Sequence, residues 1–312
     1  MVELKQPNKR IVEIFGYSPS DESHQCRTLW NLGACPFIKR PCHKKNHDNS
    51  IIYGTCSVTT PYGDCVICPN RMYADNYEVL REISRDAFGK SIEMLTYDQY
   101  IDRRKSLDTC VVALGMYSGR EIKTGQSLSM DWVLAKVTRG GLVEYTGVEV
   151  QSIDITGNYR DNWYAYKNIE HTKAIPESEH GLNWANVHKR LIPQLIRKGK
   201  VYSNSIFVKS GLYFVVPEIV YRKFEELIGA DIPQHDEKSP NALTVHTYSL
   251  SEPVPEGEIR SLKLERKIRF SLEEFSNRFI SGPNLPKSND LDYTIQKMLE
   301  IHDGAMSIDK KN

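Results

Sequence analysis

Six of the seven cysteines in this chain lie in one short stretch, and this clustering constrains the fold more than any other feature of the sequence. They are Cys26, Cys35, Cys42, Cys56, Cys65 and Cys68, while Cys110 lies apart. The odd total, and the lack of an apolar signal segment near the N-terminus, argue against a disulfide framework. Clustered thiols in a reducing compartment more often hold a metal ion, so we expect a thiolate metal site here.

Glycines and prolines separate these cysteines, which indicates a series of loops. Four thiolates on such loops suit a tetrahedral metal site, and the metal can stabilise a module too small to form its own core. The C-x-x-C pair of Cys65 and Cys68 is typical of a zinc ribbon, but the other cysteines do not repeat its spacing. The residues alone therefore leave the choice of four ligands open. Buried thiols without a metal are the alternative, and thiolates do not distinguish zinc from iron.

Beyond the cysteines, apolar side chains recur at strand and helix spacing. Strands are predicted at 110–116, 130–137, 145–155, 205–208, 212–216, 243–250 and 259–270. Helices are predicted at 75–88, 183–197, 218–228, 271–279 and 291–302, with Asp75 and Ser271 as N-caps. This mixture predicts an α/β (α+β) domain over residues 75–312, preceded by a four-cysteine module over residues 1–74.

The charge balance limits how the protein can bind other molecules. The chain has 41 lysines and arginines against 40 aspartates and glutamates, a net charge of +1. Bulk positive charge is therefore excluded as a means of holding nucleic acid, although a local basic surface is not. The longest apolar runs are far shorter than a membrane span, so no membrane partner is expected.

Two carboxylates and an amide form a candidate catalytic site. Asp131 lies at the start of one predicted strand, and Glu149 lies in the later segment GVEVQ. On a strand, Glu149 and Gln151 share one face, while Val148 and Val150 face the core on the other side. A hairpin-like neighbour would bring Asp131 opposite the polar face, so we expect the three polar side chains to meet.

Converging carboxylates repel each other, and a hard divalent cation relieves that repulsion. Mg²⁺ held by Asp131 and Glu149 would stabilise the charge that develops when water attacks a phosphodiester. The pattern D…E-x-Q is weak by itself, because it arises by chance in most chains of this length. A solvent-facing strand is the alternative interpretation.

Two polar segments downstream favour the functional interpretation. The strand at 145–155 leads into a glycine-bearing turn that ends at Arg160. Further on, Asn186, Arg190 and Gln194 fall at positions i, i+4 and i+8, on one helical face. Such a face could support a metal site or a phosphate, and an ordinary exposed helix face is the alternative.

Together these motifs resemble those of the NotI-type restriction endonucleases. The resemblance covers about residues 15 to 217 and rests on the order of Phe15-Gly16, Cys35-Pro36-Phe37, Cys42 and Lys44, Gly54-Thr55-Cys56, Ile67-Cys68-Pro69-Asn70-Arg71, Asp131-Trp132, Leu134-Ala135, Gly147-Val148-Glu149-Val150-Gln151, Asp154, Gly157, Tyr159, Asn183, Asn186-Val187, Lys189-Arg190 and Gln194. No single motif is specific, but the ordered set is.

The resemblance implies a PD-(D/E)XK-type nuclease core, a restriction-endonuclease-like mixed sheet flanked by helices, with an N-terminal four-cysteine metal domain. It selects as metal ligands Cys35, Cys42, Cys56 and Cys68. In that family the metal is iron held without inorganic sulfide, and zinc is the alternative. Asp131 and Glu149 become the Mg²⁺ ligands. Gln151 stands where most members of the wider fold have lysine, so its amide can orient water but adds no positive charge. Glu121 is an additional candidate acid.

The implied function is that of a type II restriction endonuclease, cutting both strands of DNA at a short palindromic, GC-rich site. A palindrome implies a homodimer, and the family implies a cognate DNA methyltransferase acting on the same site in a prokaryotic cytoplasm. Candidate DNA contacts are Lys44, Arg71, Arg160 and Arg190. The alternatives are a non-catalytic zinc-ribbon DNA-binding protein, and a hydrolase or transferase that uses the acidic pair on another substrate.

Overall fold

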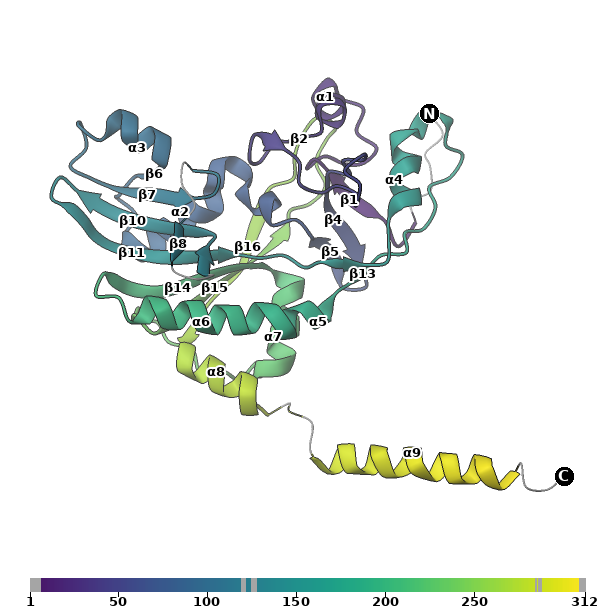
Figure 1. Ribbon diagram of the computed structural model, residues 1–312. Helices are drawn as coiled ribbons and strands as arrows, with labels where there is room; N and C mark the ends of the chain where they lie inside the picture. Colours follow the sequence, from purple (N-terminus) through teal and green to yellow (C-terminus); the bar gives the residue numbers. More distant parts are fainter. Residues whose placement is uncertain (1–6, 119–121, 125–127, 284, 286–287, 309–312) are drawn as a thin grey trace.

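A mixed β-sheet forms the centre of the computed structural model (Figure 1), which describes residues 7–118, 122–124, 128–283, 285 and 288–308. Its strands run in the order β16 (Leu262–Ser271), β15 (Ala242–Leu250), β14 (Val208–Pro217), β11 (Gly141–Val150), β10 (Trp132–Thr138), β7 (Thr109–Gly115) and β6 (Met94–Thr96). Strands β11, β14 and β15 are parallel, and β10 is antiparallel to both of its neighbours. The predicted mixed α/β class is therefore confirmed.

Helices cover both faces of this sheet. Helix α2 (Ala74–Phe88) lies on one face, where Tyr213 donates a hydrogen bond to Asp86 at 2.6 Å. On the opposite face lie α6 (Ile192–Ser203), α7 (Glu218–Ile228) and α8 (Leu272–Ser281), below the sheet in Figure 1. Because helices cover both faces, the central strands β14 and β15 are buried along nearly their whole length, including polar residues such as Thr244 and His246.

The cysteine-rich region has a small sheet of its own. Its strands are β1 (Ile11–Ile14), β4 (Thr55–Thr60) and β5 (Gly63–Val66), accompanied by α1 (His24–Leu32), β2 (Ala34–Cys35), β3 (Arg40–Pro41) and the 3-10 helix η1 (Pro69–Tyr73). Helix α4 (Arg160–Lys167), distant in sequence, packs beside it (Figure 1). There Trp163 stacks on Trp30 at 5.6 Å between ring centroids and donates to the Tyr53 carbonyl at 2.8 Å.

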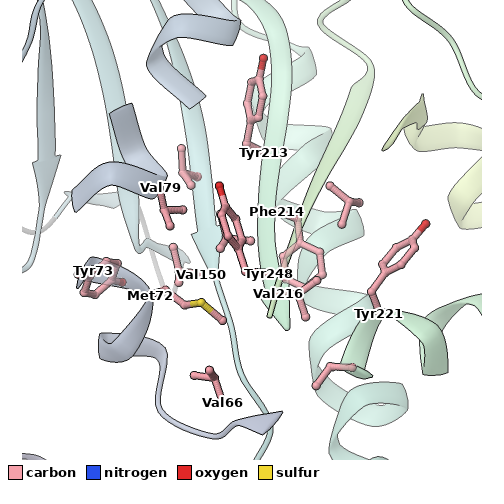
Figure 2. Close-up of a cluster of buried hydrophobic side chains, with 14 of the residues drawn as sticks. Val66, Met72, Tyr73, Val79, Val150, Tyr213, Phe214, Val216, Tyr221 and Tyr248 are labelled. Carbon is pink, nitrogen blue, oxygen red and sulfur yellow. The ribbon is translucent and has the colours of Figure 1, made fainter. Parts of the chain in front are cut away.

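One hydrophobic core joins the cysteine-rich region to the large sheet. In Figure 2, Val66 and Met72 lie with Val150, Phe214 and Val216 in a single buried cluster. The predicted division at residue 74 falls inside this continuous core. The two regions are therefore held to each other by apolar packing and not only by a linker.

Shorter elements complete the described chain. They are α3 (Tyr97–Arg103), β8 (Ile122–Thr124), β9 (Leu128–Met130), β12 (Ile155–Thr156), η2 (Ile169–His171), β13 (Gly181–Leu182), α5 (Trp184–Asn186), the π-helical turn η3 (Val187–Leu191) and α9 (Ser288–Ile308). Helix α9 extends away from the rest of the protein (Figure 1). No helix of the described residues has both the length and the apolar character needed to cross a membrane.

The predictions of helix N-caps and of strand boundaries differ in outcome. Ser271 caps α8 as predicted, since its hydroxyl accepts from the backbone N–H groups of Glu273 and Glu274. Asp75 is not an N-cap, because it lies inside α2 with a left-handed φ of 53°. The strand predicted at 212–216 is confirmed as part of β14, whereas the separate strand predicted at 205–208 is wrong, because residues 205–207 precede a single strand that runs from Val208 to Pro217.

Candidate active site and cysteine cluster

Asp131, Glu149 and Gln151 meet in the interior of the large sheet, where strand β10 begins and strand β11 ends. The antiparallel register pairs Trp132 of β10 with Val148 of β11, so Asp131 lies beside Glu149. The backbone N–H of Val150 donates to Asp131 Oδ2 at 3.0 Å, and Gln151 Nε2 donates to the same oxygen at 3.5 Å. The predicted convergence of the three side chains is therefore present in the fold.

Glu149 is buried, with only 2% of its surface exposed. Its Oε2 accepts a hydrogen bond from Lys198 Nζ, whereas its buried Oε1 has no hydrogen-bond partner among the described residues. Burial first, and then the negative charge of Asp131, raise the pKa of Glu149 to about 8, against the opposing effect of Lys198. The two carboxyl groups can hydrogen-bond only if one carries a proton, because ionised carboxylates only accept.

Lys198 and Tyr202 lie one turn apart on α6, which packs against the end of β11 that carries Glu149. The Tyr202 hydroxyl is buried and has no hydrogen-bond partner in the described part of the chain. Burial, and next the charge of Glu149, raise its pKa. Its ring lies so close to Gly147 that a Cβ atom there would come within 2.1 Å of Tyr202 Cζ. Glycine is thus required at the position that opens the GVEVQ segment.

Sequence reasoning missed Lys198 and Tyr202. A signal was present, because the spacing of four that joins Asn186, Arg190 and Gln194 reaches both residues when it is continued by two further steps. The predicted common face of the first three is confirmed. They line one cavity of about 130 Å³ together with Gln151, Ser152, Ile153, Asp154, Val187 and Leu191.

The same cavity adjoins the carboxylate site through Gln151. Asn186 Nδ2 donates to Asp154 Oδ2 at 3.0 Å, which ties the helical segment to the loop after β11. The segment passes through a π-helical turn, Val187–Leu191, before Pro193 opens α6. Such turns are often found at functional sites.

Oxygen ligands at this site fit a hard divalent cation. Asp131 and Glu149 contribute carboxylates, and the partnerless Glu149 Oε1 is the kind of buried polar atom that a cation would satisfy. No group of three or more histidine, cysteine, aspartate or glutamate side chains in the described ranges is arranged as a metal site. Mg²⁺ does not need three such ligands, because it usually keeps several waters and one or two carboxylates.

All seven cysteines, each of them described, are buried free thiols. Four interact electrostatically: the charge of Cys68 raises the pKa of Cys35, Cys42 and Cys56, after the larger effect of burial. For Cys35 the resulting pKa is about 11. These are the four cysteines that the resemblance selects as ligands.

Cys26 and Cys65 have different surroundings. Burial and then Asp21 raise the pKa of Cys26 to about 11, and burial and then Asp64 raise that of Cys65 to about 12. The Cys65 thiol donates to the carbonyl of Val66 at 3.6 Å, as the Cys56 thiol does to that of Gly54 at 3.4 Å, but Cys68 is not among the charges that raise the pKa of Cys65. The spacing-based pairing of Cys65 with Cys68 is therefore not favoured by their environments.

Backbone N–H groups are directed at three of the four clustered sulfurs. Those of Phe37 and Ile38 point at Cys35, that of Lys44 at Cys42, and those of Asn70 and Arg71 at Cys68, each lowering the pKa of the thiol. The Lys44 N–H lies 3.4 Å from Cys42 Sγ. Donors placed in this way stabilise thiolate, the form that binds a metal. Thiolates of this set would suit zinc or iron by their chemistry, but no three of them in the described part of the chain are arranged as a preformed metal site.

The candidate DNA contacts differ in exposure. Arg160 and Arg190 are exposed, and Lys44 is half-buried beside the thiols. Arg71 is wrong as a DNA contact, because its side chain is fully buried. Its Nη2 donates to Glu13 Oε1 at 3.0 Å and its guanidinium lies 5.0 Å from the centre of the Phe37 ring, so its role is structural.

Glu121 lies outside the described residues. Comparison of the sequence with protein-family models and with curated proteins finds no match to either.

Proposed function

We propose that this protein is a Mg²⁺-dependent type II restriction endonuclease that cuts both strands of duplex DNA at a short palindromic, GC-rich site. The observation that carries the proposal is the convergence of Asp131, Glu149 and Gln151, with the Val150 N–H 3.0 Å from Asp131 Oδ2. Two carboxylates held together in a buried setting are costly without a cation, and a divalent cation relieves that cost.

Asp131 and Glu149 would hold the Mg²⁺. When bound, this ion stabilises the charge that builds up on the attacked phosphate and lowers the pKa of a coordinated water. The Nε2 of Gln151 donates to Asp131 Oδ2, which leaves the amide oxygen free to orient the attacking water. Arg190, which lines the adjoining cavity, can pair with a neighbouring phosphate.

The four-cysteine cluster would hold a structural iron or zinc ion and take no part in redox chemistry. Cys68 is followed directly by η1, whose last residue Tyr73 packs on Trp132 with ring centroids 5.5 Å apart. Trp132 in turn follows Asp131. A metal that fixes these loops would therefore also stabilise the start of β10, next to the carboxylates.

The proposed partners are those of a restriction-modification system. A palindromic site calls for a homodimer, each subunit cutting one strand. The exposed Arg160 and Arg190, with Lys44, are the candidate contacts to DNA. A cognate DNA methyltransferase in the same prokaryotic cytoplasm would protect the host DNA.

Incubating plasmid DNA with the purified protein and Mg²⁺ tests the proposal. We expect discrete fragments, and we expect Asp131→Asn to lower the cleavage rate by at least about 100-fold, because it removes a metal ligand. Binding of Asp131→Asn to DNA in Ca²⁺ should stay close to that of the wild type.

Asp108→Asn is the matched control, because the Asp108 side chain is 82% exposed and lies at the far end of the neighbouring strand β7. It should cut as the wild type does. Plasmid that is bound but never cut would support the non-catalytic DNA-binding protein instead. Cutting by Asp131→Asn at the wild-type rate would show that this site is not the catalytic one.

A further inference from the structure

Lys198 is the one cation that contacts the carboxylate site within the described residues, and the proposed chemistry has not used it. It lies on α6 and is 8% exposed. Its ammonium donates to Glu149 Oε2. A lysine so deeply buried is costly unless it is paired, so its place here depends on the pairing with Glu149.

The pairing leaves the two oxygens of Glu149 in different states. Oε2 is held by Lys198, while Oε1 is buried and lacks a partner over the described ranges. The carboxyl group as a whole lies against Asp131. A carboxylate held at one oxygen has little freedom to turn, so its other oxygen stays available for a cation shared with Asp131.

Packing on the other side of α6 holds Lys198 in place. A Cβ atom at the neighbouring Gly199 would come within 2.8 Å of the Leu272 side chain of α8. Helix α6 is therefore clamped closely between α8 and β11. Lys198 cannot withdraw from Glu149 by a shift of the helix without breaking this contact.

We propose, resting on the proposed nuclease function, that Lys198 is a positioning residue of this site. It fixes Glu149 so that one carboxylate oxygen serves the metal, and it supplies beside the carboxylates the positive charge that the amide of Gln151 lacks. In this chain the charge comes from a helix instead of the strand that carries Glu149.

The test measures metal binding and cleavage separately, on the full-length protein. Mg²⁺ is titrated by calorimetry without DNA, and plasmid cleavage is timed at saturating Mg²⁺. We expect Lys198→Met to weaken Mg²⁺ binding about 10-fold and to slow cleavage about 10- to 100-fold, the range typical of residues that orient a metal ligand. Lys198→Arg keeps the charge and a donor, and should retain most of both.

Two further variants keep the test decisive. Lys198→Gln can still donate to Glu149 without a charge, so it should bind Mg²⁺ better than Lys198→Met and yet cleave slowly. Lys200→Met is the matched control, since Lys200 is exposed on the same helix, and it should behave as the wild type does. If Lys198→Met does not fold, the comparison of Lys198→Arg with Lys198→Gln decides.

The experiment distinguishes a failure of the proposed role of Lys198 from a failure of the proposed nuclease function. A wild-type protein that cuts DNA, with Lys198→Met and Lys198→Gln binding Mg²⁺ and cutting equally well, overturns the role of Lys198 alone. A wild-type protein that never cuts DNA overturns the proposed function.

Discussion

Two buried glutamates, one in each region of the molecule, are paired with a cation in different ways. In the cysteine-rich region, Glu13 is 1% exposed, and its two oxygens accept from Arg71 and from the Ser57 hydroxyl at 2.9 Å. In the large sheet, Glu149 is 2% exposed, but Lys198 holds one oxygen and the other has no partner among the described residues.

The difference separates a fully hydrogen-bonded ion pair from one that leaves a carboxylate oxygen without a partner among the described residues. Both oxygens of Glu13 accept hydrogen bonds from Arg71 or Ser57, so neither oxygen needs a ligand as a partner. Glu149 keeps an unsatisfied oxygen, and Asp131 lies beside it, so when both carboxyl groups are ionised the region holds more negative charge than its single lysine balances. A buried polar atom without a partner, next to a carboxyl group whose pKa is strongly shifted, marks a candidate functional site.

The clustered thiols give the largest expected effect, because a metal ion bound by all four would hold several loops together. If the cluster holds a structural metal, Cys56→Ser should lower the stability of the protein by several kcal/mol, since metal binding contributes directly to folding. Thermal unfolding and elemental analysis of the purified protein check this. Cys26→Ser is the control, because Cys26 is equally buried but lies outside the cluster, and it should keep the metal. Equal metal content in both variants would contradict the assignment.

Breaking the satisfied pair comes next. Arg71→Leu leaves the buried Glu13 carboxylate without its cation and should cost about 3–5 kcal/mol. The double variant Glu13→Leu/Arg71→Leu removes both charges and should recover much of that loss. Urea unfolding of the three proteins measures the effect. A double variant no more stable than Arg71→Leu would mean that the pair matters for packing and not for charge.

The pH dependence of stability should come from the unsatisfied pair. The pKa of Glu149 is about 8 in the fold against an ordinary value of 4.5 for glutamate, so between these values the folded protein binds more protons than the unfolded chain. Stability without added metal should therefore fall as pH rises from about 5 to about 8, by an amount on the order of 3–4 kcal/mol, and then level off. Unfolding midpoints across this range measure it. Glu149→Gln should remove this part of the slope, and an unchanged slope would assign it to other groups.

The smallest effect is a difference in size between two matched variants. At pH 8, Glu149→Gln relieves the repulsion with Asp131 but leaves the buried Lys198 ammonium with an uncharged partner, so the two effects should partly offset each other and the loss of stability should be smaller than that caused by Glu13→Gln, while cleavage is abolished. Glu13→Gln weakens a satisfied pair and should destabilise the protein. The same unfolding assay compares them. Equal losses in the two variants would remove the distinction between the pairs.

The sequence by itself determined the local elements and the acidic pattern. Helix α7 occupies the predicted range 218–228, and β11 carries Glu149 with Gln151 just beyond its end, because apolar periodicity and strand alternation are properties of neighbouring residues. The meeting of Asp131 with Glu149 could also be anticipated, since the two strands are consecutive and pair as a hairpin.

Only the tertiary structure decided which charged side chains are buried and with what. Arg71 reaches Glu13 across 58 residues and Lys198 reaches Glu149 across 49, and no local pattern encodes such contacts. A motif search would assign Arg71 to DNA and would overlook Lys198. Both outcomes have one physical reason: a buried charge is placed by the partner that compensates it, and that partner is brought near only when the whole chain folds.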